Sequence, residues 1–352
     1  MKKKCWIRFL DSPSDNLKSK SGPADQNPKW GWGFALAVAF ALCGVAADAQ
    51  QPKKVARICY LGNTASTVAE GLKPIRERLR ELGYIEGQNI TLESRYWEGK
   101  VERLPDLAAE LVRLDCDVIL TVGSEAAQAA KNYIKTIPVV MAFGADAVKL
   151  GIVASLARPG GNITGLTNIG AELTGKRLEL LKETVPKLAR VAFLWSPTNP
   201  AADDELKVVE AVARFLRVGL QSLEANGPDD IEGAFQAATK KRAQALMLGS
   251  GGFFAAHQER IIELATKNRI PTMYNNTRYV EAGGLMTYTY ARSENYRRAA
   301  EIVDKILKGT KPADIPVERP KKFEFVINLK AAKQIGLTIP PEVLARANRI
   351  IR

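Results

Sequence analysis

From residue 55 onward, apolar stretches of strand length alternate with amphipathic stretches of helix length. Turn residues separate them; Gly83, for example, ends a helical stretch at a position that favours glycine. A repeated strand–helix–strand series calls for a parallel sheet with helices on both faces. In the first part of the chain the predicted strands are 55–61, 89–96, 117–122 and 137–143, and the predicted helices are 68–82, 104–114 and 125–134.

The alternation starts again after a break at Arg158-Pro159-Gly160-Gly161 and a boundary at Pro186. Its predicted strands are 190–195, 218–223, 245–248, 270–274 and 284–290, and its predicted helices are 202–215, 230–243, 258–268 and 295–307. One stretch of each half matches the other, since 117–124 (DVILTVGS) parallels 244–250 (QALMLGS). The sequence therefore predicts an α/β protein with two doubly wound parallel-sheet lobes joined by a hinge. The alternative is that any two doubly wound units share such patterns.

We expect the chain to divide into a leader, two lobes and a C-terminal segment. The predicted bounds are 1–49 for the leader, 50–186 for the N-terminal lobe, 187–320 for the C-terminal lobe and 321–352 for a final strand and helices. Part of the segment 290–352 is expected to return to the first lobe. The late strand at 323–329 can join either lobe, and a crossing back gives several hinge strands between the lobes.

The N-terminus has the order of features that is typical of a secretory signal peptide. Lysines follow Met1, residues 30–47 carry no charge, and Ala47-Asp48-Ala49 fits the small-x-small cleavage pattern. We therefore expect export and removal of the leader. The alternative is an uncleaved membrane anchor, because 18 uncharged residues reach the lower limit for a membrane span.

The formal net charge of the chain is +13. A basic surface can bind nucleic acid, anionic lipid or an anionic ligand. Here the basic residues are scattered along predicted helices, in runs such as Lys73–Arg80 where they mix with glutamate, as on a solvated face. No helix-turn-helix, zinc-finger or RNA-binding signature accompanies them. We therefore predict no nucleic-acid partner, and the net charge does not identify a ligand.

The sequence offers few groups for catalysis or metal binding. His257 is its single histidine, and a Ser–His–Asp site, a Cys–His site or most zinc sites would need it. It lies at the start of a predicted helix, where a surface or capping role is expected. Cys59 and Cys116 can pair in an oxidising compartment, but neighbouring strands seldom hold disulfide geometry, so we expect buried free thiols. We predict no catalytic residues, no metal and no cofactor.

Small, hydroxylated and amide residues recur where the predicted strands end. In doubly wound sheets, ligands bind beyond the carboxyl ends of the strands. Such residues supply hydrogen bonds and stacking surfaces but no nucleophile with its base, which suits a binding cleft. The alternative is that they are ordinary turn residues. The candidates from this placement are Asn63, Ser66, Gly123, Ser124, Phe143, Asp146, Ser196, Asn199, Ser250 and Tyr274.

The stretch Gly170–Arg177 (GAELTGKR) nearly fits the phosphate loop G-x-x-x-x-G-K-[ST]. Its last residue, Arg177, replaces the hydroxyl residue that would hold magnesium. Apolar residues such as Leu173 and Leu178 indicate that a helix begins there and packs one face. We therefore predict a packed helix and no nucleotide.

Several stretches resemble a family of bacterial ABC-transporter substrate-binding proteins that is distinct from the branched-chain amino-acid binders. They are 151–165 (GIVASLARPGGNITG), 175–182 (GKRLELLK), 279–286 (YVEAGGLM), and 321–329 with 337–340. The resemblance covers roughly residues 55–350. It implies a type I periplasmic-binding fold, a hinged cleft for a small molecule, an importer permease with its ATPase as partners, and a periplasmic location. We expect a monomer.

Some members of this family are linked to aromatic amino acids. The resemblance therefore implies ring-stacking roles for Phe143, Tyr274 and Tyr288, and polar anchoring by Ser66, Ser124, Asp146 and Asn199. The family usually has Asp-Pro-Val where this chain has Asp146-Ala147-Val148, and often has Asp-Pro where it has Gly249-Ser250. Because both departures lie at the predicted cleft, the identity of the ligand is not carried over.

Two other functions are compatible with the sequence. An extracytoplasmic sensor module would bind its ligand in the same way and present it to a receptor. A secreted α/β enzyme would need a base, and with one histidine it would depend on Asp146 or Glu125.

Overall fold

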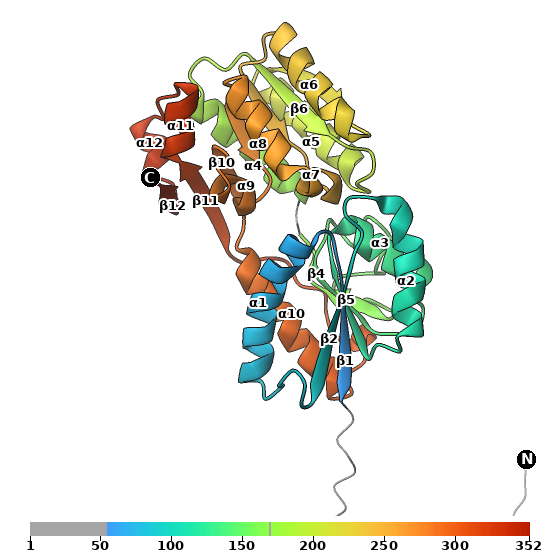
Figure 1. Ribbon diagram of the computed structural model, residues 1–352. Coiled ribbons are helices and arrows are strands. Elements are labelled where there is room, and N and C mark those ends of the chain that lie inside the picture. Colours follow the sequence, from blue (N-terminus) through green and yellow to red (C-terminus); the bar gives the residue numbers. More distant parts are fainter. Residues whose placement is uncertain (1–54, 169) are drawn as a thin grey trace, which may run out of the picture. The chain divides into compact units, whose positions relative to one another are not determined.

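A computed structural model describes residues 55–168 and 170–352 of the chain. The predicted leader, 1–49, lies outside these residues. The described chain forms two α/β lobes, each built on its own sheet (Figure 1). The predicted architecture of two parallel-sheet lobes is confirmed.

The first lobe contains a five-stranded sheet of order β2-β1-β3-β4-β5, in which all neighbouring strands are parallel. Its strands are β1 (Ala56–Gly62), β2 (Ile90–Tyr96), β3 (Val118–Val122), β4 (Val139–Phe143) and β5 (Ile163–Gly165). Its helices are α1 (Ala65–Glu81), η1 (Val101–Arg103), α2 (Leu104–Arg113), α3 (Ser124–Tyr133) and, from far along the chain, α10 (Arg292–Leu307).

Helices cover both faces of this sheet, as its strands require. The central strands β3 and β4 are buried along their whole length, so apolar residues point to both sides. One face packs on α1 and α10 through residues such as Leu72, Ile75 and Ile302. The other packs on α2 and α3 through residues such as Leu107 and Ala127.

The second lobe contains a seven-stranded sheet of order β12-β11-β10-β9-β8-β6-β7. Its strands are β6 (Arg190–Trp195), β7 (Gly219–Glu224), β8 (Ala245–Leu248), β9 (Thr272–Tyr274), β10 (Met286–Tyr290), β11 (Phe323–Asn328) and β12 (Arg349–Ile351). Its helices are α4 (Gly170–Thr184), α5 (Ala202–Phe215), α6 (Pro228–Lys240), α7 (Gly252–Ala256), α8 (Gln258–Lys267), α9 (Thr277–Glu281), α11 (Leu329–Ile335) and α12 (Pro341–Leu344). Only the β10–β11 pair of this sheet is antiparallel among the described strands.

The chain crosses between the lobes between β5 and α4, between β10 and α10, and again before β11. After α10, the short helix η2 (Pro312–Asp314) and the residues beyond it stay on the first lobe, where Thr164 Oγ1 donates to the Ile315 carbonyl at 2.6 Å. Leu166 forms a bridge with Glu318, so the first and last crossings run side by side. Adjacent crossing segments of this kind can act as a hinge.

The structure shows where the elements near the predicted boundaries lie. The late strand, β11, joins the second lobe, whereas α10 packs against α1 of the first lobe. Helix α4 packs against α5 and β10 of the second lobe, although it precedes the boundary predicted at residue 186. The division into domains by residue number stays a prediction.

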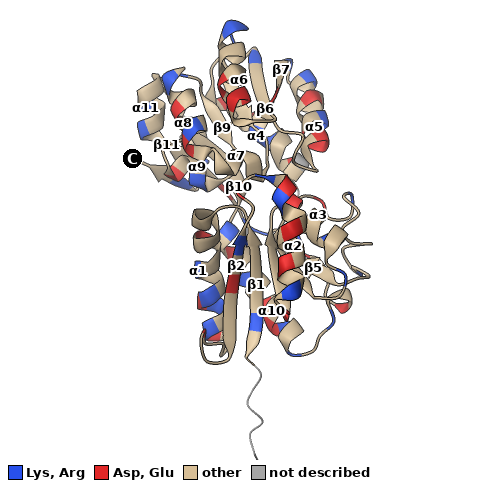
Figure 2. Cartoon of the chain, turned by 45° about the vertical axis from the view of Figure 1, so that its right-hand side comes forward, with Lys and Arg blue, Asp and Glu red and all other residues tan. Residues whose placement is uncertain are grey.

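Charged residues of both signs lie together on the helices of both lobes (Figure 2). Arg78 of α1, for example, pairs with Glu81 of the same helix and with Glu301 of α10. Among the described residues, no helix is long and apolar enough to cross a membrane.

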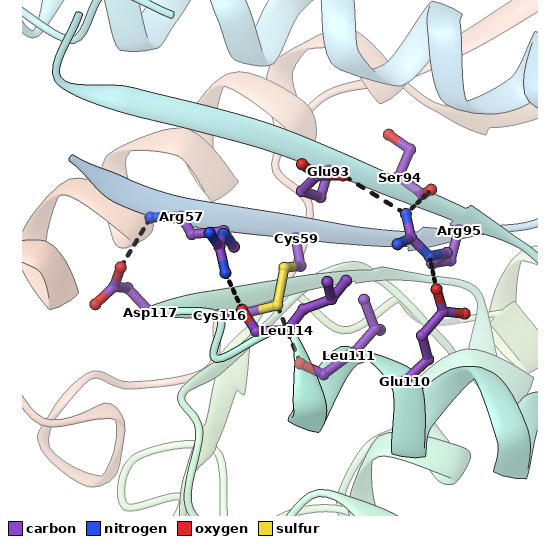
Figure 3. Close-up of a disulfide and its surroundings, with 10 residues drawn as sticks. All are labelled: Arg57, Cys59, Glu93, Ser94, Arg95, Glu110, Leu111, Leu114, Cys116 and Asp117. Carbon is purple, nitrogen blue, oxygen red and sulfur yellow. Dashed lines mark hydrogen bonds and ion pairs between the residues drawn. A yellow bond between two sulfur atoms is a disulfide. The ribbon is translucent and has the colours of Figure 1, made fainter. Parts of the chain in front are cut away.

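A disulfide joins Cys59 of β1 to Cys116, so the expectation of free thiols is wrong (Figure 3). The β1–β3 ladder starts at Ile58 and Val118, which places Cys116 before the paired part of β3. Outside the ladder the side chain of Cys116 can turn toward β1, and the Cα atoms lie 5.9 Å apart, within the disulfide range. Asp115, with a φ of 52°, makes the turn that leads into it.

Replacing both Cys59 and Cys116 by alanine is expected to lower the free energy of unfolding by about 2–5 kcal/mol, because the bridge closes a loop across a sequence separation of 57 residues. Urea unfolding of both proteins, with and without reductant, measures this loss. A linked Cys59–Cys116 peptide in a non-reducing digest is the control. Equal stability of wild type with and without reductant would contradict the prediction.

Candidate functional site

The cavity that we take as the candidate site lies at the carboxyl ends of the strands of both sheets. Its volume is about 110 Å³. Both lobes line it. Its side chains include the amides of Asn63, Asn168, Asn199, Asn275 and Asn276, the rings of Trp97, Phe143 and Tyr290, and the charged groups of Glu125, Arg177, Arg278 and Arg292.

The loop after β8 is one of the places where the two lobes touch. Asn63, which follows β1, donates from Nδ2 to the Gly252 carbonyl at 2.6 Å, and its Oδ1 accepts the Gly99 N–H at 2.6 Å. Glu125, at the start of α3, accepts the Gly252 N–H on Oε1 at 2.7 Å. Main-chain groups of Gly252 are therefore held by side chains of the opposite lobe.

A second buried carboxylate holds the same loop from its own lobe. Glu205 of α5 accepts the Ser250 N–H on Oε2 at 2.9 Å. Burial raises the pKa of Glu125 and of Glu205, while the hydrogen bonds from the loop act in the opposite direction. The loop's N–H groups thus compensate part of the cost of burying two carboxylates close together.

The glycines of this loop have distinct roles. Gly251 has a φ of 137°, a conformation that residues with a side chain rarely adopt. At Gly252 the constraint is space, because an added Cβ would lie 2.3 Å from two ring atoms of the buried Trp97. The contact between the lobes therefore depends on the absence of a side chain at position 252.

The arginines of the cavity have different sets of partners. Arg177 donates to the main-chain carbonyls of Tyr288 (2.8 Å) and Asn275 (3.1 Å). Burial lowers its pKa, and the charge of Glu205 opposes this effect. Arg278 pairs with Glu70 of the other lobe at 2.7 Å. Arg292, the first residue of α10, has no carboxylate partner among the described residues.

Six residues that the sequence predicted line the cavity: Asn63, Gly123, Ser124, Phe143, Asn199 and Ser250. Several of them also hold the lining in place. Ser124 Oγ accepts the Ala145 N–H at 2.8 Å, and Asn199 Nδ2 donates to the Ser250 carbonyl at 3.0 Å. Their role in ligand binding stays a prediction.

Five predicted residues do not line the cavity: Ser66, Asp146, Ser196, Tyr274 and Tyr288. Exposed Asp146 accepts the N–H groups of the turn that follows it, at residues 148 and 149, and Ser66 lies beside Arg278 of the opposite lobe, with its Oγ 3.4 Å from Nη2. Buried Ser196 bonds to the hydroxyl of Thr198.

The two tyrosines pack inside the second lobe. Tyr274 stacks on Tyr279 with ring centroids 4.9 Å apart, and Tyr288 stacks on Phe323 of the neighbouring strand at 6.2 Å. Tyr290, two residues beyond Tyr288 at the end of β10, is the tyrosine of this strand that reaches the cavity.

Sequence reasoning missed Trp97, Arg177, Arg278 and Arg292 of the cavity. Trp97 comes directly after β2, and Arg292 follows β10 by two residues, so the strand-end rule could have found both. Arg177 was noticed only as the residue that breaks the phosphate-loop pattern. In the structure Gly175 of this stretch packs against Val208 and Val212 of α5, which makes it a helix-contact residue.

Among the described residues, the cavity offers hydrogen-bonding amides, charged groups and rings. Within this part of the chain no group of three or more metal-ligating side chains occurs. His257 packs against the ring of Phe253 at 5.0 Å and does not line the cavity; burial lowers its pKa. Glu125, the carboxylate in the cavity, is hydrogen-bonded to Gly252.

Solved structures share this two-lobed architecture. A conserved domain protein from Vibrio cholerae O1 biovar El Tor str. N16961 superposes with a TM-score of 0.79 at 26% identity, covering 84% of this chain and 100% of that one. An ABC domain from Streptococcus pneumoniae in complex with L-Trp gives a TM-score of 0.78 at 25% identity, covering 84% and 99%. Among curated proteins, a tyrosine-binding protein from Clostridioides difficile (strain R20291) is 23% identical over 259 residues, 74% of each chain.

The model of the ABC transporter substrate binding protein family matches residues 64–351. The chain belongs to this family, as the sequence motifs had indicated. Its members are extracytoplasmic proteins that bind small molecules and work with ABC transporter permeases.

Replacing Gly252 by alanine is expected to push the lobes apart, because the new Cβ and the Trp97 ring cannot both keep their places. We expect a loss of about 1–3 kcal/mol of stability, as for other overpacked sites, together with a larger radius of gyration in small-angle X-ray scattering. Gly233→Ala on α6 is the matched control, because a Cβ there meets open space. A Gly252→Ala protein with wild-type stability and scattering would contradict the role of this contact.

Proposed function

We propose that this protein is the exported binding component of an ABC importer, and that it carries an aromatic α-amino acid in the cavity between its lobes. The observation that carries the proposal is the composition of the cavity. It combines rings, amides, a carboxylate and arginines, contributed by both lobes.

An α-amino acid in water carries both a carboxylate and an ammonium group, so its site needs partners of both signs or dipoles that replace them. The cavity has the carboxyl group of Glu125 and the guanidinium groups of three arginines. Side-chain rings of the ligand can pack on Phe143, Tyr290 or Trp97, since aromatic pairs contribute beyond their buried area. Two relatives support the same class of ligand, one described as tyrosine-binding and one solved with L-Trp.

Because both lobes contribute these groups, ligand binding favours closure of the lobes. A ligand that contacts both lobes stabilises the form in which the lobes touch, because the open form offers only one set of contacts. The direct bonds from Asn63 and Glu125 to Gly252 add to that form. In this account the permease and ATPase receive the closed protein, and no bond of the ligand is broken.

The proposal includes the route and the state in which the protein works. Residues 1–49 direct export to the periplasm and are removed there, or stay as an anchor. The mature protein acts as a monomer and does not bind nucleic acid.

We expect L-tryptophan, L-tyrosine or L-phenylalanine to raise the melting temperature in a panel of the common amino acids, aromatic acids and purines. A ligand at about 100 times its dissociation constant adds about 2.7 kcal/mol to the stability of the protein that binds it. Polar amino acids such as L-glutamine and L-aspartate are the matched negative compounds. A panel in which no aromatic amino acid shifts the melting temperature would count against this ligand class.

A further inference from the structure

We infer that Arg292 forms an anion-binding site in the cavity and that it binds the carboxylate of the ligand. This inference rests on the proposed function, because it assigns one pole of an amino acid to one side chain. It goes beyond that proposal by naming the residue that makes the protein prefer an acid over its uncharged derivatives.

The first observation is the lack of partners on the Arg292 guanidinium. Its Nη2 donates to the Tyr296 hydroxyl at 3.0 Å, which is a neutral acceptor. Its Nε is buried and has no hydrogen-bond partner. No carboxylate of the described residues forms an ion pair with it; Glu70, whose charge acts on Arg292, pairs with Arg278. A half-buried guanidinium without an anionic partner is costly, and an anion that enters the cavity would reduce that cost.

The other two arginines of the cavity have ionic or main-chain partners. Arg177 donates to two main-chain carbonyls, and Arg278 pairs with Glu70. Each of them therefore has partners that hold it in the structure as it stands. Arg292 is the arginine of the described cavity lining whose one polar side-chain or main-chain partner is a hydroxyl group.

The second observation is how Arg292 is held. Its Cζ lies 4.3 Å from the centre of the Phe143 ring, within the range of a cation–π contact. Phe143 ends β4 and packs against Tyr290 and Tyr296, with ring centroids 5.9 and 5.7 Å away. The rings fix the guanidinium plane without neutralising its charge. A fixed guanidinium with free donors is the geometry that suits a carboxylate, which can accept two parallel hydrogen bonds.

The position of Arg292 in the chain connects ligand binding with closure of the lobes. It follows β10 of the second lobe by two residues and starts α10 of the first lobe, so it lies on a crossing segment. A carboxylate bound there would be held at the hinge, while the rest of the ligand reaches the lining of both lobes.

The test compares acids with their primary amides, because the amide keeps the ring and the ammonium group but loses the negative charge. Isothermal titration calorimetry is done on the full chain with L-tryptophan, L-tyrosine, L-tryptophanamide and L-tyrosinamide. For wild type we expect the acids to bind and the amides to bind at least tenfold more weakly. For Arg292→Gln we expect affinity for the acid to fall by about 10- to 100-fold and affinity for the amide to change little. Arg292→Lys, which keeps the charge but loses the planar fork, should lie between them.

Arg297→Gln is the matched control, because Arg297 is on the same helix but pairs with Glu81 away from the cavity. It should bind both acid and amide as wild type does. Melting curves of all variants show whether each is folded. If Arg292→Gln does not fold, the preference of wild type and of Arg292→Lys for acid over amide still tests the inference.

Each contrary outcome has a separate meaning. Wild type that binds acid and amide equally would overturn the anion site and leave the aromatic ligand class intact. An equal loss of acid and amide affinity in Arg292→Gln would show that Arg292 supports the Phe143 packing and does not bind the carboxylate. Wild type that binds none of the four compounds would overturn the proposed ligand class, and the anion site with it.

Discussion

Parallel strands all end at one edge of their sheet, and this constraint places everything that the protein can use to bind. In the first lobe the residues that follow β1, β3 and β4 are Asn63, Gly123 and Gly144, and all of them line the cavity. The second sheet contributes Asn199, Ser250 and Asn275 by the same rule. The cavity exists because these two edges face each other across the crossing segments. A different strand connectivity in either lobe would remove the part of the cavity lining that this lobe contributes.

Buried charged groups at the cavity form hydrogen bonds with main-chain groups, and Arg292 is the exception to this pattern. The carboxylates of Glu125 and Glu205 are buried, and each accepts a main-chain N–H of the loop at residues 250–252. Arg177 is equally buried and donates to main-chain carbonyls. These bonds hold the lining in place, which lowers the conformational entropy that the protein loses when a ligand binds. The exception is Arg292, whose donors are left for a group that the protein does not itself supply.

Local patterns were sufficient to predict the two lobes and most of their strands and helices, whereas β12, near the end of the segment 321–352, was not predicted. The strand Asp117–Val122 and the turn Gly123-Ser124 follow from apolar runs and turn residues that are close in sequence, and both are found nearly as predicted. What failed depends on contacts between distant segments. The Cys59–Cys116 bridge joins residues far apart in the chain, and so does the antiparallel pairing of β11 with β10, where the sequence had left the choice of lobe open. Tyr274 and Tyr288 were predicted to stack on a ligand because their packing partners, Tyr279 and Phe323, could not be assigned from the sequence.

The central claim is that one small molecule is bound between the lobes and contacts both of them. A crystal structure of the full chain with the tightest-binding aromatic amino acid tests this claim most directly. The account predicts electron density for the ligand in the cavity, with contacts to Asn63 or Phe143 of the first lobe and to Ser250 or Asn275 of the second. Density on the outer surface of the protein, or a ligand that contacts a single lobe while the other lies open, would contradict it.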